Sequence, residues 1–173
     1  MELVKPCLRY KQSYISYIQE LGEEERYPFP LDFDHSDFVA MLQRNEDFAK
    51  GVNIPQGYVP SSTWWLVHNE EIIGVVNLRH YLNDNIKHIG GHVGLGIRPS
   101  YRGRGLSTKL LGLCMNEAKL LGISALHVHC YESNIASMSM IKSCGGELHS
   151  IVGTDDNNAE GVARFIISLC PAH

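Results

Sequence analysis

The stretch from Gly90 to Leu121 most constrains what this chain can fold into. Residues 90–97 read GGHVGLGI, which is typical of a strand, residues 98–105 read RPSYRGRG, and residues 106–121 have the apolar spacing of a helix. A glycine- and arginine-rich loop that leads directly into a helix combines free backbone N–H groups, a positive dipole end and guanidinium charges. The stretch therefore predicts a strand, a phosphate-binding loop and a helix in an α/β domain.

Two common phosphate motifs do not fit this loop. The dinucleotide fingerprint G-x-G-x-x-G needs a third glycine, but Pro99 stands there when counting from Gly94, and Thr108 when counting from Gly103. A P-loop needs a lysine directly after its last glycine, whereas Lys109 lies a full turn inside the helix. The loop therefore belongs to another kind of phosphate site.

The rest of the pattern predicts a mixed sheet with flanking helices. Helical spacing covers residues 10–21 and 36–44, residues 48–60 read as a loop, and residues 63–67 and 72–79 read as a hairpin followed by a turn at 83–85. A strand at 124–130 is expected to run parallel to the glycine-rich strand, because a helix separates them. A helix from Ser133 or Asn134 and a hairpin of 147–152 with 161–169, turning at 155–158, complete one domain of residues 1–173.

Composition excludes several classes of protein. The chain has 44% apolar and 20% charged residues and a net charge of -4, which disfavours a nucleic-acid binder despite the local arginines. No apolar run approaches a membrane span and no secretory segment opens the chain, so no membrane partner and a cytoplasmic location are expected. There is no C-x-x-C pair, and the pair His127 and His129 lacks a third ligand at supporting spacing, so no metal is expected.

The loop and its surroundings resemble the GNAT superfamily of N-acetyltransferases. Arg102, Gly105 and Ser107 occupy the fixed places of its Q/R-x-x-G-x-G/A segment, although Ser107 stands where Gly or Ala is usual. The strand end 97–99 is similar to that family's fourth strand, and 134–137 with 144–146 match its N-x-x-A/S and L-G-F places. More narrowly, residues 77–80, 90–99 and 134–146 resemble a bacterial branch of predicted acetyltransferases.

The resemblance implies a splayed sheet that binds acetyl-CoA. The pantetheine arm of coenzyme A would add itself like a strand beside Leu95 and Ile97, and the loop amides would hold the diphosphate. Without the loop, four glycines in eight residues are explained equally well by close packing under a neighbouring helix. The expected cofactor-binding residues are Leu95, Ile97, Arg98, Arg102, Gly103, Arg104, Gly105, Leu106, Ser107, Asn134 and Ser137.

The catalytic residues follow the family pattern only in part. Matching through Arg102 places His92 where the family often has a glutamate base, and imidazole, with a pKa of about 6.5, suits that role. A lone strand histidine is also a common structural residue. The family's usual acid is a tyrosine on the later helix, and Ile141 stands there. Tyr131, Cys130, His129 or a water molecule are the alternatives, or the thiolate leaves without an acid.

The expected activity is direct transfer of an acetyl group to a primary amine of a small molecule or peptide. Arg79 and His80 end a strand beside the expected cleft and are candidates to bind an anionic group of that acceptor, or simply a strand end in solvent. No residue has the setting of a covalent nucleophile. The alternatives are a non-catalytic acyl-CoA sensor and, less in keeping with the charge, a nucleic-acid contact through Arg98 to Arg104. A homodimer is a further candidate.

Overall fold

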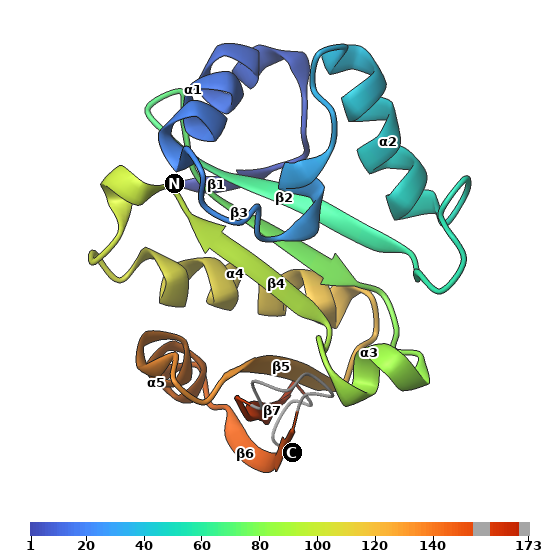
Figure 1. Ribbon diagram of the computed structural model, residues 1–173, viewed down its shortest axis with the longest axis vertical. Coiled ribbons are helices and arrows are strands. Elements are labelled where there is room, and N and C mark those ends of the chain that lie inside the picture. Colours follow the sequence, from blue (N-terminus) through green and yellow to red (C-terminus); the bar gives the residue numbers. More distant parts are fainter. Residues whose placement is uncertain (154–159, 170–173) are drawn as a thin grey trace.

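The computed structural model describes residues 1–153 and 160–169, which form two antiparallel sheets with helices on both sides (Figure 1). The first sheet has the order β1-β2-β3-β4 and the second has the order β5-β7-β6. The mixed α/β class expected from the sequence is confirmed. The strands are β1 (Glu2–Val4), β2 (Ser61–His68), β3 (Glu71–Arg79), β4 (Val93–Ile97), β5 (Ala125–Tyr131), β6 (Glu147–Val152) and β7 (Val162–Ser168).

Five α-helices and three short 3-10 turns connect these strands within the described residues. The α-helices are α1 (Lys11–Leu21), α2 (Phe38–Lys50), α3 (Asp84–His88), α4 (Leu106–Leu120) and α5 (Ile135–Ser143). The 3-10 turns are η1 (Leu8–Tyr10), η2 (Phe29–Asp32) and η3 (Pro99–Tyr101). The helix expected at 36–44 extends to Lys50, and the turn expected at 83–85 opens a short helix. The turn expected at 155–158 lies outside the described residues.

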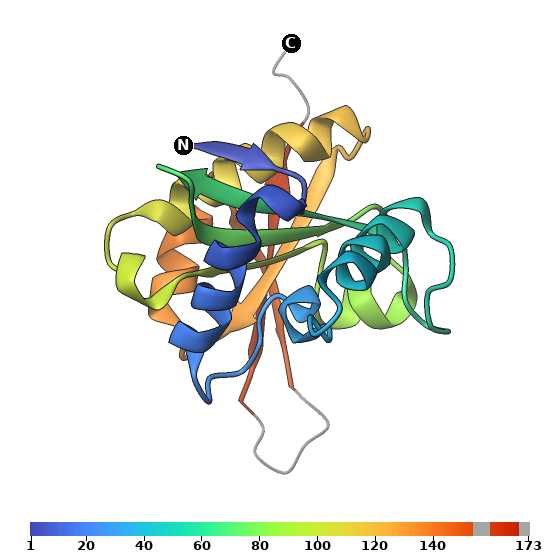
Figure 2. The ribbon, with the colours of Figure 1, turned by 90° about the horizontal axis from the view of Figure 1, so that it is seen from above.

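The two faces of the first sheet carry separate cores, because side chains alternate along a strand. Trp65 packs with tyrosines of α1 and with Phe38 and Met41 of α2. Trp64 faces the other way, toward Leu110 and the rest of α4. Seen from above, α1 and α2 lie over the same face (Figure 2). The adjacent tryptophans thus belong to different layers, and both are core residues.

The two sheets separate between β4 and β5. The isolated bridge between these parts of the chain is antiparallel, pairs Gly91 with Val128, and lies before β4 begins. Gly90 and Gly91 both have positive φ there, 119° and 68°. This single bridge lies outside β4 and does not set the relative direction of β4 and β5, which form no ladder with each other in the described residues. The expected separation of the two strands is present.

No helix in residues 1–153 and 160–169 is long and apolar enough to cross a bilayer.

Candidate active site

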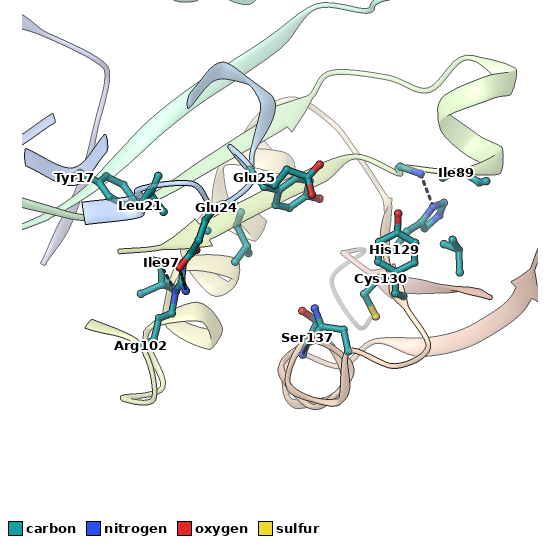
Figure 3. A pocket seen from close by; sticks show the side chains of 17 residues that line it. Tyr17, Leu21, Glu24, Glu25, Ile89, Ile97, Arg102, His129, Cys130 and Ser137 are labelled. Atoms are coloured by element: carbon teal, nitrogen blue, oxygen red, sulfur yellow. Dashed lines mark hydrogen bonds and ion pairs between the residues drawn. The ribbon is translucent and has the colours of Figure 1, made fainter. Parts of the chain in front are cut away.

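A cleft of about 650 Å³ opens where β4 and β5 separate (Figure 3). Residues 95–97 of β4 form one wall, and residues 129–131 of β5 form the other. Asn134 and Ser137 at the start of α5 also line the cleft, as do Glu24, Glu25 and Tyr27 from the segment after α1. In Figure 3, Arg102 and His129 lie on opposite sides of the cleft.

The β4 wall presents backbone groups to the cleft. The N–H of Arg98 donates to Ile73 O on β3 at 2.9 Å, so the alternating backbone groups of Ile97 point away from β3. Arg102 Nε donates to Ile97 O at 3.0 Å, which agrees with that direction. The same alternation turns the N–H and C=O of Leu95 toward the cleft. This edge is suited to hydrogen-bond an extended ligand that carries amides.

The loop before α4 offers unused donors. Gly103 and Gly105 have φ of 77° and 73°, and no side chain caps α4. Within the described chain, the backbone N–H groups of residues 103–107 donate to no acceptor. Free amides at the start of a long helix are the structural requirement for a diphosphate site. The loop directly follows Arg102, at the end of the cleft that this arginine lines.

The three arginines of this region have different environments. Arg102 is half exposed and donates to both Glu24 carboxylate oxygens, at 2.8 and 3.2 Å. Arg104 donates to Ser100 O at 3.2 Å and lies 5.1 Å from the centre of the Tyr101 ring. Both guanidinium groups are near the loop and partly open to solvent.

Arg98 departs from its expected role as a phosphate ligand. Its side chain is 5% exposed and pairs with Glu20 and with Glu71, the latter at 3.1 Å. It also donates to Ser16 Oγ at 2.8 Å. These contacts tie β4 to α1, and a buried guanidinium held by two carboxylates has no reason to leave them. Arg98 is therefore a structural residue.

His92 also departs from its expected role as the base. It is 6% exposed, lies outside the lining of the cleft, and its Nδ1 accepts the N–H of His127 at 2.9 Å. Burial lowers the pKa of His92 to about 4, with His127 and Arg79 acting in the same direction. A buried, weakly basic imidazole that does not reach the cleft is not placed to take a proton from an acceptor.

The glycines of β4 make room for another part of the chain rather than for a ligand. A Cβ at Gly96 would stand 2.4 Å from Tyr27 O, and a Cβ at Gly94 would stand 3.1 Å from Pro28 Cβ. The segment 27–28 therefore packs directly on β4, on the face that α1 and α2 cover. The sequence left two explanations for these glycines, a ligand or close packing of the chain. Close packing explains why Gly94 and Gly96 carry no side chain, whereas the cleft lies at the edge of β4.

The sequence reasoning missed Glu24, Glu25 and Tyr27 as cleft residues. The acidic run 23–25 reads as a solvated turn, and nothing local connects it with the glycine-rich strand. The only signal was indirect, since four glycines in β4 require a close neighbour whose position in the sequence they do not specify.

The alternatives to the missing acid all lie at the cleft. Ile141 is fully buried in the core beside α4, whereas His129, Cys130 and Tyr131 line the β5 wall. His129 Nδ1 accepts the N–H of Gly90 at 3.1 Å, and burial lowers the pKa of His129 to about 4. Its Nε2 is buried and has no partner in the described residues. His129 is thus a neutral imidazole that carries its proton on Nε2.

The remaining predicted residues are also placed by the structure. Asn134 Oδ1 accepts the N–H of Ser137 at 3.0 Å and caps α5. His80 Nε2 is 2.8 Å from Ser62 Oγ, on β2. Arg79 Nη1 donates to Gly91 O at 2.8 Å, and the same nitrogen lies 3.5 Å from the Cβ position of Gly90, which lines the cleft. No three metal-binding side chains are grouped in the part of the chain that is described.

Solved structures that align with this chain include acetyltransferases. The microcin C7 self-immunity acetyltransferase MccE, in complex with acetyl-CoA and AMP, aligns with a TM-score of 0.70 at 15% identity, over 96% of this chain and 91% of that one. RimL, a ribosomal alpha-N-protein acetyltransferase in complex with coenzyme A, aligns with a TM-score of 0.69 at 14% identity, over 96% and 92%. A chimera of the spermidine N-acetyltransferase SpeG from Vibrio cholerae and hSSAT gives 0.67 at 15%, over 98% and 97%.

A comparison with curated protein sequences gives no match. The model of the acetyltransferase (GNAT) family matches residues 17–145, which include β4, the loop, α4, β5 and α5. This match covers well over half of the chain and includes both walls of the cleft, β4 and β5. The chain therefore belongs to the GNAT family of acetyltransferases.

Proposed function

We propose that this enzyme transfers an acetyl group from acetyl-CoA directly to a primary amine of a small molecule or peptide. The observation that carries the proposal is two sets of open backbone groups at one cleft. The first is the cleft-facing N–H and C=O of Leu95 with the N–H of Ile97, and the second is the amides of residues 103–107. Structural relatives that hold acetyl-CoA or coenzyme A, and act on spermidine or a ribosomal protein, support the same reading.

The residues that would hold acetyl-CoA are those of the cleft and the loop. Gly103 to Ser107 would donate backbone N–H groups to the diphosphate, and Arg102 and Arg104 would add charge-assisted hydrogen bonds. Leu95 and Ile97 would pair with the pantetheine amides, and Asn134 and Ser137 flank the β5 side of the path. This direction brings the thioester to the end of the cleft where His129 lies.

The chemistry requires a neutral amine and a place for negative charge. His129, neutral and with an unpartnered Nε2–H, is suited to stabilise a carbonyl oxygen as charge develops on it. Tyr131 and Cys130 stand on the same wall as proton donors for the departing thiolate. Arg79 and His80 remain the proposed residues for an anionic group of the acceptor.

The experiment is a thiol-release assay with purified protein, acetyl-CoA and a panel of amines. Release that depends on the amine supports the transferase. Binding is measured separately, since acetyl-CoA at 100 times its dissociation constant stabilises the folded state by about 2.7 kcal/mol. Thermal protection without release from any amine would instead favour the acyl-CoA sensor, for which the apolar Ile141 at the usual tyrosine position is the supporting observation.

A further inference from the structure

We infer that the acceptor is an amine that also carries a carboxylate, such as a free amino acid, with its ammonium group at Glu25 and its carboxylate at Arg79. The inference rests on the proposed acetyl transfer and specifies its acceptor. It depends on two charged side chains of opposite sign: Glu25, which lines the cleft, and Arg79, which lies beside Gly90 of that lining. Neither has an ionic partner among residues 1–153 and 160–169.

Glu25 is the first of these side chains. It lines the cleft, and Figure 3 shows its side chain between those of Arg102 and His129. Within residues 1–153 and 160–169 its carboxylate makes no hydrogen bond and no ion pair. Glu24, the other carboxylate in the lining, pairs with Arg102, and Glu20 and Glu71 both pair with Arg98. Glu25 therefore presents an open carboxylate to the cleft, to which an ammonium group can bind.

Arg79 is the second. It ends β3 partly buried, and the one hydrogen bond of its side chain in the described residues is the 2.8 Å bond from Nη1 to Gly91 O. No carboxylate of the described chain pairs with it, so most of its five N–H donors lack a protein acceptor. Burial lowers the pKa of Arg79 because the guanidinium loses water without gaining an anion. A ligand carboxylate would satisfy this group in the bidentate geometry that arginine favours.

Tyr27 connects the two positions. Its hydroxyl lies 3.3 Å from the Cβ position of Gly94, so the phenol lies on β4 at the cleft although the residue as a whole is half exposed. Burial of the hydroxyl raises the pKa of Tyr27, while Arg79 acts to lower it and Glu25 to raise it. Both charges are therefore close enough to act on one hydroxyl group.

The step itself needs no further reactant. The amine nitrogen forms a bond to the thioester carbonyl carbon, the carbon–sulfur bond breaks, and the sulfur leaves with the electron pair. The ammonium group loses two protons in becoming the amide. Glu25 accepts them in turn, passes the first to solvent before the attack, and passes the second to the thiolate. The carboxylate at Arg79 takes no part in bond changes, and its role is to orient the acceptor.

The first arm of the test uses the wild-type enzyme. Free amino acids are screened by thiol release, and the best is compared with its amide, its decarboxylated amine and a diamine of similar length. We expect the amide and the decarboxylated amine to have KM values at least tenfold higher. Equal KM values for the acid and the decarboxylated amine, or a preference for the diamine, would overturn the inference and leave the acetyl transfer standing.

The second arm uses variants. Glu25→Gln should raise KM for the amino acid at least tenfold and leave acetyl-CoA binding unchanged, whereas Glu23→Gln, in the same acidic run, should change neither. Arg79→Gln should raise KM for the amino acid but not for its amide, which has no carboxylate to lose. An equal effect of Arg79→Gln on both substrates would contradict the assignment, and acetyl-CoA binding and thermal unfolding confirm that each variant is folded.

A binding measurement separates this inference from the proposed function. Calorimetry of the best amino acid with the protein saturated in coenzyme A reads the acceptor site without turnover. If the wild-type protein binds the amino acid, Glu25→Gln does not, and the wild-type protein releases no thiol, the acceptor site is supported and the transferase is rejected. Absence of amino-acid binding in wild type would reject the site.

Discussion

Arg102 and Glu24 are joined by hydrogen bonds of 2.8 and 3.2 Å at one end of the cleft. Arg102, which we propose binds the diphosphate, is therefore held by the segment that leads to Glu25. Both side chains are 48% exposed. An exposed pair of this kind contributes about 0–1 kcal/mol. The pair is therefore weak enough for a diphosphate to replace the carboxylate.

This relationship predicts opposite effects for its two members. Arg102→Gln should weaken acetyl-CoA binding about tenfold or more, because a charge-assisted contact is lost. Glu24→Gln should strengthen acetyl-CoA binding by up to about fivefold. The diphosphate would no longer have to replace the Glu24 carboxylate at Arg102, an ion pair that contributes about 1 kcal/mol or less. Titration calorimetry checks both, and weaker binding in Glu24→Gln would show that the pair helps to form the site.

Alanine substitutions at Gly105, before α4, and at Gly112, within α4, should change the stability of the fold in opposite directions. Gly105 has φ of 73°, so Gly105→Ala should cost about 1 kcal/mol and weaken acetyl-CoA binding by turning the loop amides away. Gly112 lies inside α4, and a Cβ there meets nothing within 4 Å. Gly112→Ala should therefore add about 0.5–1 kcal/mol of stability and leave binding unchanged. Urea unfolding with and without acetyl-CoA distinguishes the two, and equal behaviour would contradict the role of Gly105.

The packing of segment 27–28 on β4 predicts a graded effect. Gly96→Ala places a Cβ 2.4 Å from a backbone oxygen and should destabilise the fold by about 2–4 kcal/mol. Gly94→Ala meets Pro28 Cβ at 3.1 Å and should cost less. The measurement is the urea midpoint at constant m-value. A Gly96→Ala protein as stable as wild type would mean that the segment leaves β4 readily.

The buried histidines predict how stability depends on pH. The pKa of both His92 and His129 is about 4 in the fold, below the 6.5 of an unfolded chain, so the unfolded state binds more protons between these values. Stability should be fully present above about pH 6.5 and fall as pH decreases toward 4. One such shift corresponds to about 3 kcal/mol. Urea unfolding between pH 4.5 and 8 tests this, and His92→Gln should flatten the slope while the same change at exposed His68 should not.

The parts of the fold that local sequence determines were predictable. The strand-to-helix stretch around Gly105, the hairpin at 61–79, the cap at Asn134 and the final hairpin all depend on neighbours within a few residues. The open amides of residues 103–107 could be expected for the same reason, since they depend on backbone groups rather than on distant side chains, and their binding of a diphosphate stays a prediction.

The parts that depend on distant contacts were not predictable. Arg98 reads as a loop arginine, but Glu20 and Glu71 lie far from it in the sequence and draw it into the core. His92 matches the position of the family's base, but matching one position in a motif says nothing of burial, and the side chain lies outside the lining of the cleft. Glu25 and Tyr27 reach the cleft only because segment 27–28 crosses β4, and a helix end at Lys50 rather than Arg44 follows from packing of Phe48 with Phe29 and Phe33.

The adjacent tryptophans supply an optical probe of each layer. They are the only two in the chain, and Trp64 faces α4 while Trp65 lies among the aromatic residues of α1 and α2. In Trp64→Phe the remaining tryptophan is Trp65, in the layer next to the proposed acceptor residues. In Trp65→Phe the remaining tryptophan is Trp64, in the layer of α4 behind the proposed diphosphate loop. Fluorescence from the two proteins would therefore report separately on the arrival of each substrate.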